Sequence, residues 1–283
     1  METLRTEILL EGLAFAEGPR WHEGRLWFSD MHSQEVLAVG LDGKRETIVT
    51  VPGDPSGLGW GADGRLLVVS MRDRRLLRLE DDGGLGQVAD ISRLASFHCN
   101  DMVVDTKGRA YVGNFGWDLH GGGEARGATL VMVTPDGDVS AVAEDLEFPN
   151  GAVISDDGGT LIIGETMGRR LTAFDIEADG TLTHRRVWAQ LSKVMPDGIC
   201  LDADGAIWVA SPISHGCFRV LEGGEITHKV EVDTQAFACM LGGPERRHLF
   251  VCTASSSQPE VCESNRDGRI EIVQVDVPGT GLP

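Results

Sequence analysis

The sequence predicts an all-β fold, a six-bladed β-propeller with four antiparallel strands in each blade. Three observations lead to this prediction: apolar segments recur at a near-regular interval, glycine turns precede them, and no segment between them has helical periodicity. Of the 283 residues, 37 are glycine. This share, about 13%, is nearly twice the usual ~7%, and the glycines follow no three-residue period. Collagen is therefore excluded, and many tight turns are indicated.

Each predicted repeat begins with a glycine turn that leads into an apolar strand. Gly64 precedes residues 65–69, and Gly108 precedes residues 109–112. Successive turn glycines are spaced by 40, 44, 50 and 47 residues in the five clear copies, Gly24, Gly64, Gly108, Gly158 and Gly205. A degenerate sixth copy at residues 243–247 precedes a strand at 248–251. About 45 residues suit one four-stranded blade, so residues 1–283 are predicted to form a single six-bladed domain.

A second hairpin is predicted inside the repeats, and a closure is predicted between the chain ends. Asp-Gly pairs at residues 42–43, 82–83 and 136–137 separate two β-like segments, which is a strong hairpin signal. The segment 6–10 is apolar and extended in pattern, as is the segment 270–275. We expect the N-terminal strand to pair with the last blade and so close the ring, because closure removes two exposed sheet edges.

The charge balance excludes two classes of partner. With 44 Asp and Glu against 25 Lys and Arg, the net charge is −19. Phosphate backbones and anionic membranes are bound through Lys and Arg, so neither a nucleic acid nor a membrane is expected as a partner. A small molecule remains the expected partner, and the sequence leaves a homo-oligomer open.

Cysteine usage and the N-terminus indicate a cytoplasmic protein. The six cysteines form no Cys-x-x-Cys pair and lie far apart, which favours a reduced protein. Whether Cys252 and Cys262 pair cannot be decided from their spacing. The first ten residues lack the apolar core of a signal peptide, and no apolar run approaches 18 residues.

Polar residues recur at one position of the repeat, just ahead of the first strand of each unit. Walking back 9 to 11 residues from equivalent strand positions gives one column of residues: Glu17, Ser56, Asn100, Asn150, Asp197 and Cys239. Equivalent positions of a propeller form a ring about the central axis. Four oxygen-bearing side chains are therefore expected to meet there, and oxygen ligands suit a hard divalent cation. The alternative is that Asn-Gly and Asp-Gly are turn residues only.

The motifs that contain this column resemble the SMP-30/gluconolactonase/LRE-like family. They are Ala16-Glu17-Gly18-Pro19-Arg20-Trp21, His98-Cys99-Asn100-Asp101, Pro149-Asn150-Gly151 and Pro196-Asp197-Gly198. The resemblance covers essentially the whole chain. It implies a six-bladed propeller that binds one divalent metal ion in its channel and hydrolyses lactones. Ca²⁺ is the expected ion, with Zn²⁺, Mn²⁺ and Mg²⁺ as alternatives.

The resemblance also implies roles for individual residues. Glu17, Asn150 and Asp197 are implied as metal ligands, and Asn100 as a fourth ligand or a substrate ligand. Asp197 is also the implied base. Since a metal ligand has a depressed pKa and is a weak base, Asp101 is a second candidate for that role, or a carboxylate that supports the site from outside.

Two departures from the sugar-lactonase members concern the substrate. His98 stands where those members carry Arg, and it is a candidate substrate ligand or proton shuttle. An aromatic, glycine-rich insertion follows residue 112 and contains Phe115, Trp117 and His120. We expect Trp117 and His120 to bind substrate from a loop over the channel mouth, although ordinary loop packing would give the same pattern. If they form a wall, the substrate is more apolar than a sugar lactone.

Three functions remain compatible with the sequence. The leading one is a metal-dependent lactonase, in which the ion polarises the carbonyl group and an activated water opens the ring. A phosphotriesterase would use the same ion on a P=O bond. A non-catalytic interaction propeller would hold the ion as a structural plug. The sequence contains no Gly-x-Ser-x-Gly motif, which argues against a serine nucleophile.

Overall fold

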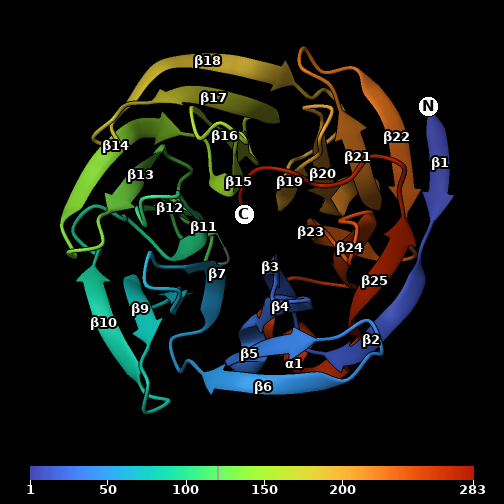
Figure 1. Cartoon of the computed structure of the whole chain (residues 1–283), viewed down its shortest axis with the longest axis horizontal. Helices are drawn as coiled ribbons and strands as arrows, with labels where there is room; N and C mark the ends of the chain where they lie inside the picture. The colour runs from blue at the N-terminus through green and yellow to red at the C-terminus, as the bar shows by residue number, and fades with distance from the viewer. Residues whose placement is uncertain (120) are drawn as a thin grey trace.

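The computed structural model describes residues 1–119 and 121–283, and their strands form six sheets around a central axis (Figure 1). The predicted six-bladed propeller is confirmed. Blade 1 contains β3 (Ala16–His22), β4 (Arg25–Asp30), β5 (Glu35–Val39) and β6 (Arg45–Thr50). Blade 2 contains β7 (Pro55–Trp60), β8 (Leu66–Ser70), β9 (Arg75–Leu79) and β10 (Leu85–Asp90). Blade 3 contains β11 (Cys99–Val104), β12 (Ala110–Asn114), β13 (Ala128–Val133) and β14 (Val139–Leu146).

The other three blades follow in chain order, and the first strand of each lies nearest the axis (Figure 1). Blade 4 contains β15 (Pro149–Ile154), β16 (Thr160–Glu165), β17 (Arg170–Ile176) and β18 (Leu182–Gln190). Blade 5 contains β19 (Ile199–Leu201), β20 (Ile207–Ser211), β21 (Gly216–Val220) and β22 (Ile226–Glu231). Blade 6 contains β23 (Gln235–Gly242), β24 (His248–Ala254), β25 (Gly268–Gln274) and β2 (Glu7–Leu13). Short 3-10 turns lie at η1 (Met31–Ser33) and η2 (Pro212–Ser214), and α1 (Pro259–Asn265) follows β24.

The glycines that marked the repeats adopt the backbone conformation that their turns require. Gly24, Gly64, Gly108, Gly158 and Gly205 all have φ between 71° and 78°. This left-handed region is costly for residues with a Cβ, which explains why glycine recurs at these turns. The glycine spacing was therefore a direct record of the hairpin between the first two strands of each blade.

The ring is closed by the N-terminal segment, as the sequence predicts. Strand β2 pairs antiparallel with β25, with Glu7 opposite Ile272 and Leu13 opposite Gly268. One feature was not predicted: β1 (Glu2–Arg5) pairs in parallel with β22, so blade 5 has five strands. The N-terminal segment thus joins blades 5 and 6 through consecutive strands.

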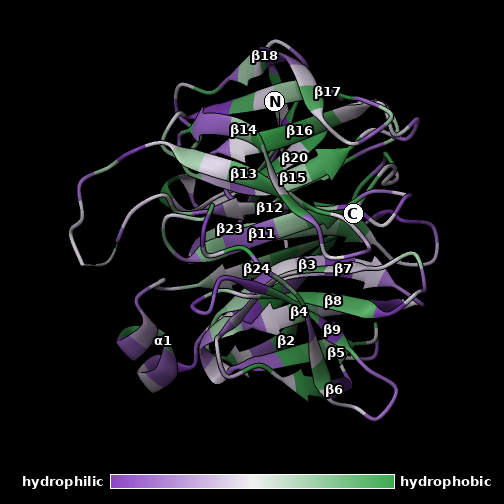
Figure 2. Ribbon diagram, turned by 90° about the vertical axis from the view of Figure 1, so that its left-hand side faces the viewer, coloured by the Kyte–Doolittle hydropathy of each residue, from purple (hydrophilic) through white to green (hydrophobic). Residues whose placement is uncertain are grey.

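The hydrophobic core is divided among the interfaces between neighbouring blades. One cluster fills the space between blades 2 and 3, another that between blades 3 and 4, and a third that between blades 4 and 5. The second strand of a blade, such as β8 or β16, is buried on both faces, so most of its residues are apolar in succession rather than in alternation. Figure 2 shows apolar strands through the body of the ring and polar loops at its edges. None of the described helices is long and apolar enough to cross a membrane.

The C-terminal segment crosses one end of the channel. After β25, Gly279 forms a β-bridge with Asp202 of blade 5, and Leu282 forms one with Ile154 of blade 4. The Leu282 N–H donates to the Ile154 carbonyl at 3.0 Å, and the Ile154 N–H donates to the Leu282 carbonyl at 2.8 Å. The C-terminus therefore lies near the centre of the ring in Figure 1.

Candidate functional site

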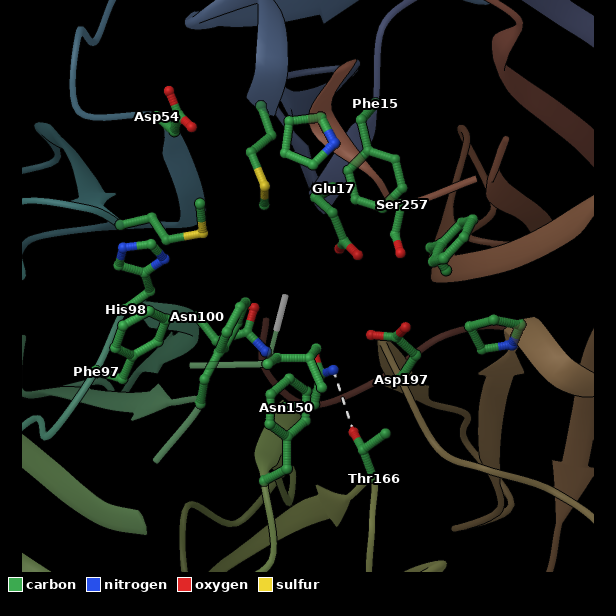
Figure 3. Close-up of a pocket in the computed structure, with 18 of the residues that line it drawn as sticks. Phe15, Glu17, Asp54, Phe97, His98, Asn100, Asn150, Thr166, Asp197 and Ser257 are labelled. Carbon is green, nitrogen blue, oxygen red and sulfur yellow. Dashed lines mark hydrogen bonds between the residues drawn. The ribbon is translucent and has the colours of Figure 1, made fainter. Parts of the chain in front are cut away.

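A cavity of about 520 Å³ opens at the other end of the channel, and four predicted ligand residues line it. Figure 3 shows Glu17, Asn100, Asn150 and Asp197 pointing toward one another from different blades. Glu17 lies on β3, Asn100 on β11 and Asn150 on β15, whereas Asp197 lies just before β19. All four side chains belong to residues that are at most 9% exposed. The structure thus brings the predicted set together on the floor of one cavity.

A β-bulge occurs at three of these side chains, Glu17, Asn100 and Asn150. The register of the first two strands shifts between Cys99 and Met102 in blade 3, and between Pro149 and Ala152 in blade 4. The ring residue lies at or inside each shift. A bulge inserts one extra residue in a strand and redirects the side chains around it. These irregularities therefore create a ring of polar side chains on strands that are otherwise apolar.

The glycine after the ring residue serves the packing of neighbouring blades. A Cβ on Gly18 would lie 2.6 Å from the Ser56 carbonyl oxygen in blade 2, and one on Gly151 would lie 2.6 Å from the Ile199 nitrogen in blade 5. Both distances are shorter than real contacts allow, so only glycine fits at these positions. These glycines therefore let the backbone of one blade approach that of the next blade closely.

The expected column of ring residues is wrong in one blade. In five blades the ring residue lies four positions before the residue that pairs near the start of the second strand. In blade 1, for example, Glu17 lies four positions before Trp21, which pairs with Leu26. In blade 6 the corresponding pair is Leu241 with Leu249, which places Phe237 rather than Cys239 in the ring. The hairpin of blade 6 is longer, so counting back along the chain ended two residues too late. Phe237 lines the cavity, whereas Cys239 is buried with its Sγ 3.9 Å from that of Cys200.

The amide of Asn150 is oriented by a residue that the sequence analysis missed. Its Nδ2 donates to Thr166 Oγ1 at 3.2 Å, as the dashed line in Figure 3 shows. The Thr166 hydroxyl donates its only proton to the Pro196 carbonyl oxygen at 2.7 Å, so toward Asn150 it must act as the acceptor. The Asn150 carbonyl oxygen is consequently left for the cavity. Thr166 follows β16 directly, and only the pairing of β15 with β16 reveals its place beside Asn150.

Buried carboxylates make the floor of the cavity electrostatically unbalanced. Burial raises the pKa of Glu17 well above its ordinary value, and the charges of Asp197 and Asp101 raise it further. Burial also raises the pKa of Asp197 to about 8, while hydrogen bonding by Asn150 acts in the opposite direction. Two buried carboxylates that face each other favour protonation or a cation between them.

Asp101 lies outside this cavity, beneath its floor. Its Oδ1 accepts from Arg20 Nη2 at 2.6 Å and from the Met102 N–H at 2.8 Å. Arg20 is 3% exposed and also donates to the carbonyl groups of Leu58 and Pro19. This guanidinium is therefore already used by Asp101 and the backbone. Its charge lowers the pKa of Glu17 only in part, since the pKa stays well above its ordinary value.

Of the other predicted substrate residues, His98 lines the cavity and Trp117 does not. His98 lines the cavity, with its ring stacked on Phe97 at 4.1 Å between centroids. Trp117 is 6% exposed and lies behind the wall, where it packs on Phe148 at 5.6 Å. The expectation that Trp117 contacts substrate is corrected accordingly: the insertion folds back, and Phe148 and Phe115 present the surface instead. His120 lies outside the described residues.

The six cysteines are free thiols, including Cys252 and Cys262.

The donor set fits a hard divalent cation. No group of three or more His, Cys, Asp or Glu side chains suited to a metal ion occurs in residues 1–119 and 121–283. The ring instead combines the carboxylates of Glu17 and Asp197 with the amides of Asn100 and Asn150. Such oxygen donors suit Ca²⁺, Mg²⁺ or Mn²⁺ better than soft metals. A cation bound there would also offset the two uncompensated carboxylates.

The comparison with known families agrees with this arrangement. The family model described as the SMP-30/gluconolactonase/LRE-like region matches residues 15–255. The chain belongs to this family. The matched segment runs from the residue before β3 through β24 and therefore contains all four ring residues, which lie between 17 and 197.

Several members of the family are similar over nearly their whole length. Pentonolactonase XacC of Haloferax volcanii is 28% identical, over 98% of this chain and 96% of that protein. Regucalcin of Xenopus laevis is 25% identical, over 92% and 90%. Among solved structures, a gluconolactonase of Xanthomonas campestris has a TM-score of 0.75 at 25% identity, covering 98% of this chain and 89% of that one. A calcium-binding regucalcin of Agrobacterium tumefaciens has a TM-score of 0.83 at 22% identity, over 100% and 98%, and shares the fold.

Proposed function

We propose that this protein is a lactonase that depends on one divalent metal ion, with Ca²⁺ as the favoured ion. The observation that carries the proposal is the convergence of Glu17, Asn100, Asn150 and Asp197 on the floor of a cavity large enough for a small-molecule ester. The relatives named as pentonolactonase and gluconolactonase support the reaction, and those named as regucalcin support the ion.

The same four residues would hold the ion. When bound, it supplies a Lewis acid that polarises the lactone carbonyl and stabilises negative charge on its oxygen. Thr166 fixes the Asn150 amide with its carbonyl oxygen toward the cavity. This second contact orients a ligand without touching the ion, which is how protein sites usually hold their donors in place.

Asp197 is the base that this proposal assigns. It lines the cavity, whereas Asp101 is held below the floor by Arg20. Asp197 would take a proton from a water molecule, which adds to the carbonyl carbon of the lactone. The ring C–O bond then breaks, and the ring oxygen receives a proton, so that a hydroxycarboxylate is formed. His98 and the aromatic wall would position the substrate and exclude other water.

A panel of lactones, assayed by acid release with Ca²⁺ and with EDTA, tests the proposal. We expect turnover that EDTA abolishes and Ca²⁺ restores, and a loss of kcat/KM of about 10³-fold or more in Asp197→Asn. Direct titration should also show weaker Ca²⁺ binding in Asp197→Asn and in Glu17→Gln. Asp204→Asn is the matched control, because this aspartate is 64% exposed in the hairpin of blade 5 and should leave both properties unchanged.

Three results would contradict the proposal. Full activity of Asp197→Asn would remove the residue assignment. Hydrolysis of phosphotriesters in place of lactones would assign the same site to a different reaction. Tight Ca²⁺ binding without turnover of either class would indicate a structural ion in a non-catalytic propeller.

A further inference from the structure

A second ring of side chains lies above the proposed metal site. It consists of the residues two positions before each floor residue, and all six of them line the cavity: Phe15, Asp54, His98, Phe148, Met195 and Gln235. One member comes from each blade or from the connection that leads into it. The lower ring faces the reacting group, so the upper ring surrounds whatever the substrate carries beyond that group.

The upper ring is divided into a polar side and an apolar side. Asp54 and His98 belong to neighbouring blades 2 and 3 and lie on the same side in Figure 3. Phe148, Met195 and Phe15 belong to blades 4, 5 and 1, and Phe237 of the lower ring continues this surface in blade 6. Phe15 and Phe237 pack edge to face, with 4.7 Å between their centroids. The apolar side therefore draws its residues from four blades, and two of them are in direct contact.

The wider lining is rich in apolar side chains on both sides of the cavity, and Phe97 stacks on His98 itself. Five of the nine phenylalanines and four of the eight methionines of the chain line this one cavity. Phe148 even adopts a left-handed conformation, with φ at 64°. This conformation is unfavourable for a bulky residue and persists only where the surroundings determine it. The wall is thus a specific arrangement of aromatic and thioether side chains.

Two of the polar groups near the apolar wall are already engaged. Gln235 donates through its Nε2 to the Ser255 carbonyl at 2.7 Å, and Thr166 is bonded to Asn150 and Pro196. On the polar side, Asp54 is paired with Arg72 at 2.6 Å. The ring nitrogens of His32, which also lines the cavity, have no hydrogen-bond partner among the described residues. His32 stacks on Phe15 with 5.3 Å between ring centroids, so its open nitrogens lie where the polar side meets the apolar wall.

We infer that the substrate is a lactone with an alkyl or aryl substituent, rather than a polyhydroxylated sugar lactone. The inference rests on the proposed lactonase function and names its substrate class. The substituent lies against Phe148, Met195 and Phe15, while His32 and His98 face its polar edge. A sugar lactone carries hydroxyl groups around its ring, and those turned toward the wall would lose water without gaining a partner.

The test is a series of γ-lactones with unbranched alkyl chains of increasing length, compared with pentono- and gluconolactone at saturating Ca²⁺. Since each buried methylene contributes about 0.8 kcal/mol, kcat/KM should rise about threefold to fourfold for each added carbon until the wall is covered. Sugar lactones should be the poorer substrates. Titration with alkyl-substituted γ-lactams, which are hydrolysed far more slowly, should give the same dependence of Kd on chain length.

Phe148→Asn isolates the contribution of the wall. Asparagine tolerates the left-handed conformation, so this variant removes apolar surface without backbone strain. We expect it to flatten the chain-length dependence through KM, whereas Phe148→Leu should retain it. A preference for sugar lactones, or a flat dependence in a protein that still hydrolyses lactones, would overturn this inference alone. Absence of turnover on every lactone would overturn the proposed function and this inference with it.

Discussion

The two ends of the central channel are built on the same six blades but differ in how charge is balanced. At the open end, Glu17 and Asp197 are buried on a cavity floor, and burial raises the pKa of both. Below them, Asp101 is equally buried but is paired with Arg20, whose guanidinium also bonds to backbone carbonyl groups. The C-terminal segment then crosses the far end.

This difference indicates which end needs a ligand. A buried ion pair with saturated hydrogen bonds is complete without a partner, whereas two buried carboxylates are not. The charges of the closed end are therefore balanced by the chain itself, whereas the open end is the candidate site. Three experiments test this distinction between the two ends of the channel.

The largest effect is expected at the closed end. Arg20→Met would leave Asp101 as an uncompensated buried charge, so the free energy of unfolding should fall by about 3–5 kcal/mol in urea titrations. Arg25→Met is the matched control, because Arg25 pairs with Glu46 at 2.6 Å on the surface and should contribute less than about 1 kcal/mol. Equal losses in both variants would show that Arg20 does not hold the channel closed.

A smaller effect is expected at the open end. Thr166→Val removes the hydroxyl that orients Asn150 while keeping the side-chain volume. Loss of such an orienting contact typically weakens metal affinity about 10- to 100-fold, which calorimetric titration with Ca²⁺ can measure. Thr253→Val is the control, since Thr253 is also buried but bonds to Glu271 in blade 6. Unchanged affinity in Thr166→Val would indicate that Asn150 does not bind the ion through its carbonyl oxygen.

The smallest effect concerns pH and stability without metal. Glu17 and Asp197 have raised pKa values in the folded protein, so above pH about 4 the folded state retains protons that the unfolded state has released. Stability in EDTA should therefore fall as pH rises from about 4 to 8. Thermal melts should show a shift of a few degrees in this window.

The double variant Glu17→Gln/Asp197→Asn is the control for this pH dependence. It lacks both titrating groups, so its melting temperature should vary less over the same range. Parallel curves for the two proteins would mean that these carboxylates do not cause the dependence.

Much of the candidate site could be predicted from the sequence because the repeat carries the information locally. Turn glycines such as Gly64 and Gly108 identify the hairpins, and counting from them finds Glu17, Asn100, Asn150 and Asp197. The same counting failed at Cys239, because one longer hairpin in blade 6 shifted the register by two residues. A periodic pattern predicts equivalent positions only where the loops between them have equal length.

Contacts between strands and between blades could not be predicted in this way. Thr166 meets Asn150 across a strand pair, and Arg20 of blade 1 meets Asp101 of blade 3, 81 positions away. Trp117 was expected to contact substrate, and it lies behind Phe148 instead. The contacts of Arg20 and Trp117 depend on how separate blades pack, and that of Thr166 depends on how β15 pairs with β16. No local motif records either.

The sequence by itself determined the six blades, the closing strand and the polar ring, because turn chemistry and strand periodicity act over a few residues. Only the tertiary structure decided which charges were balanced, which side of the cavity was apolar and where the aromatic insertion packed. Those properties arise from side chains that are distant along the chain and adjacent in the ring, so burial and pairing fix them only when all the blades are in place.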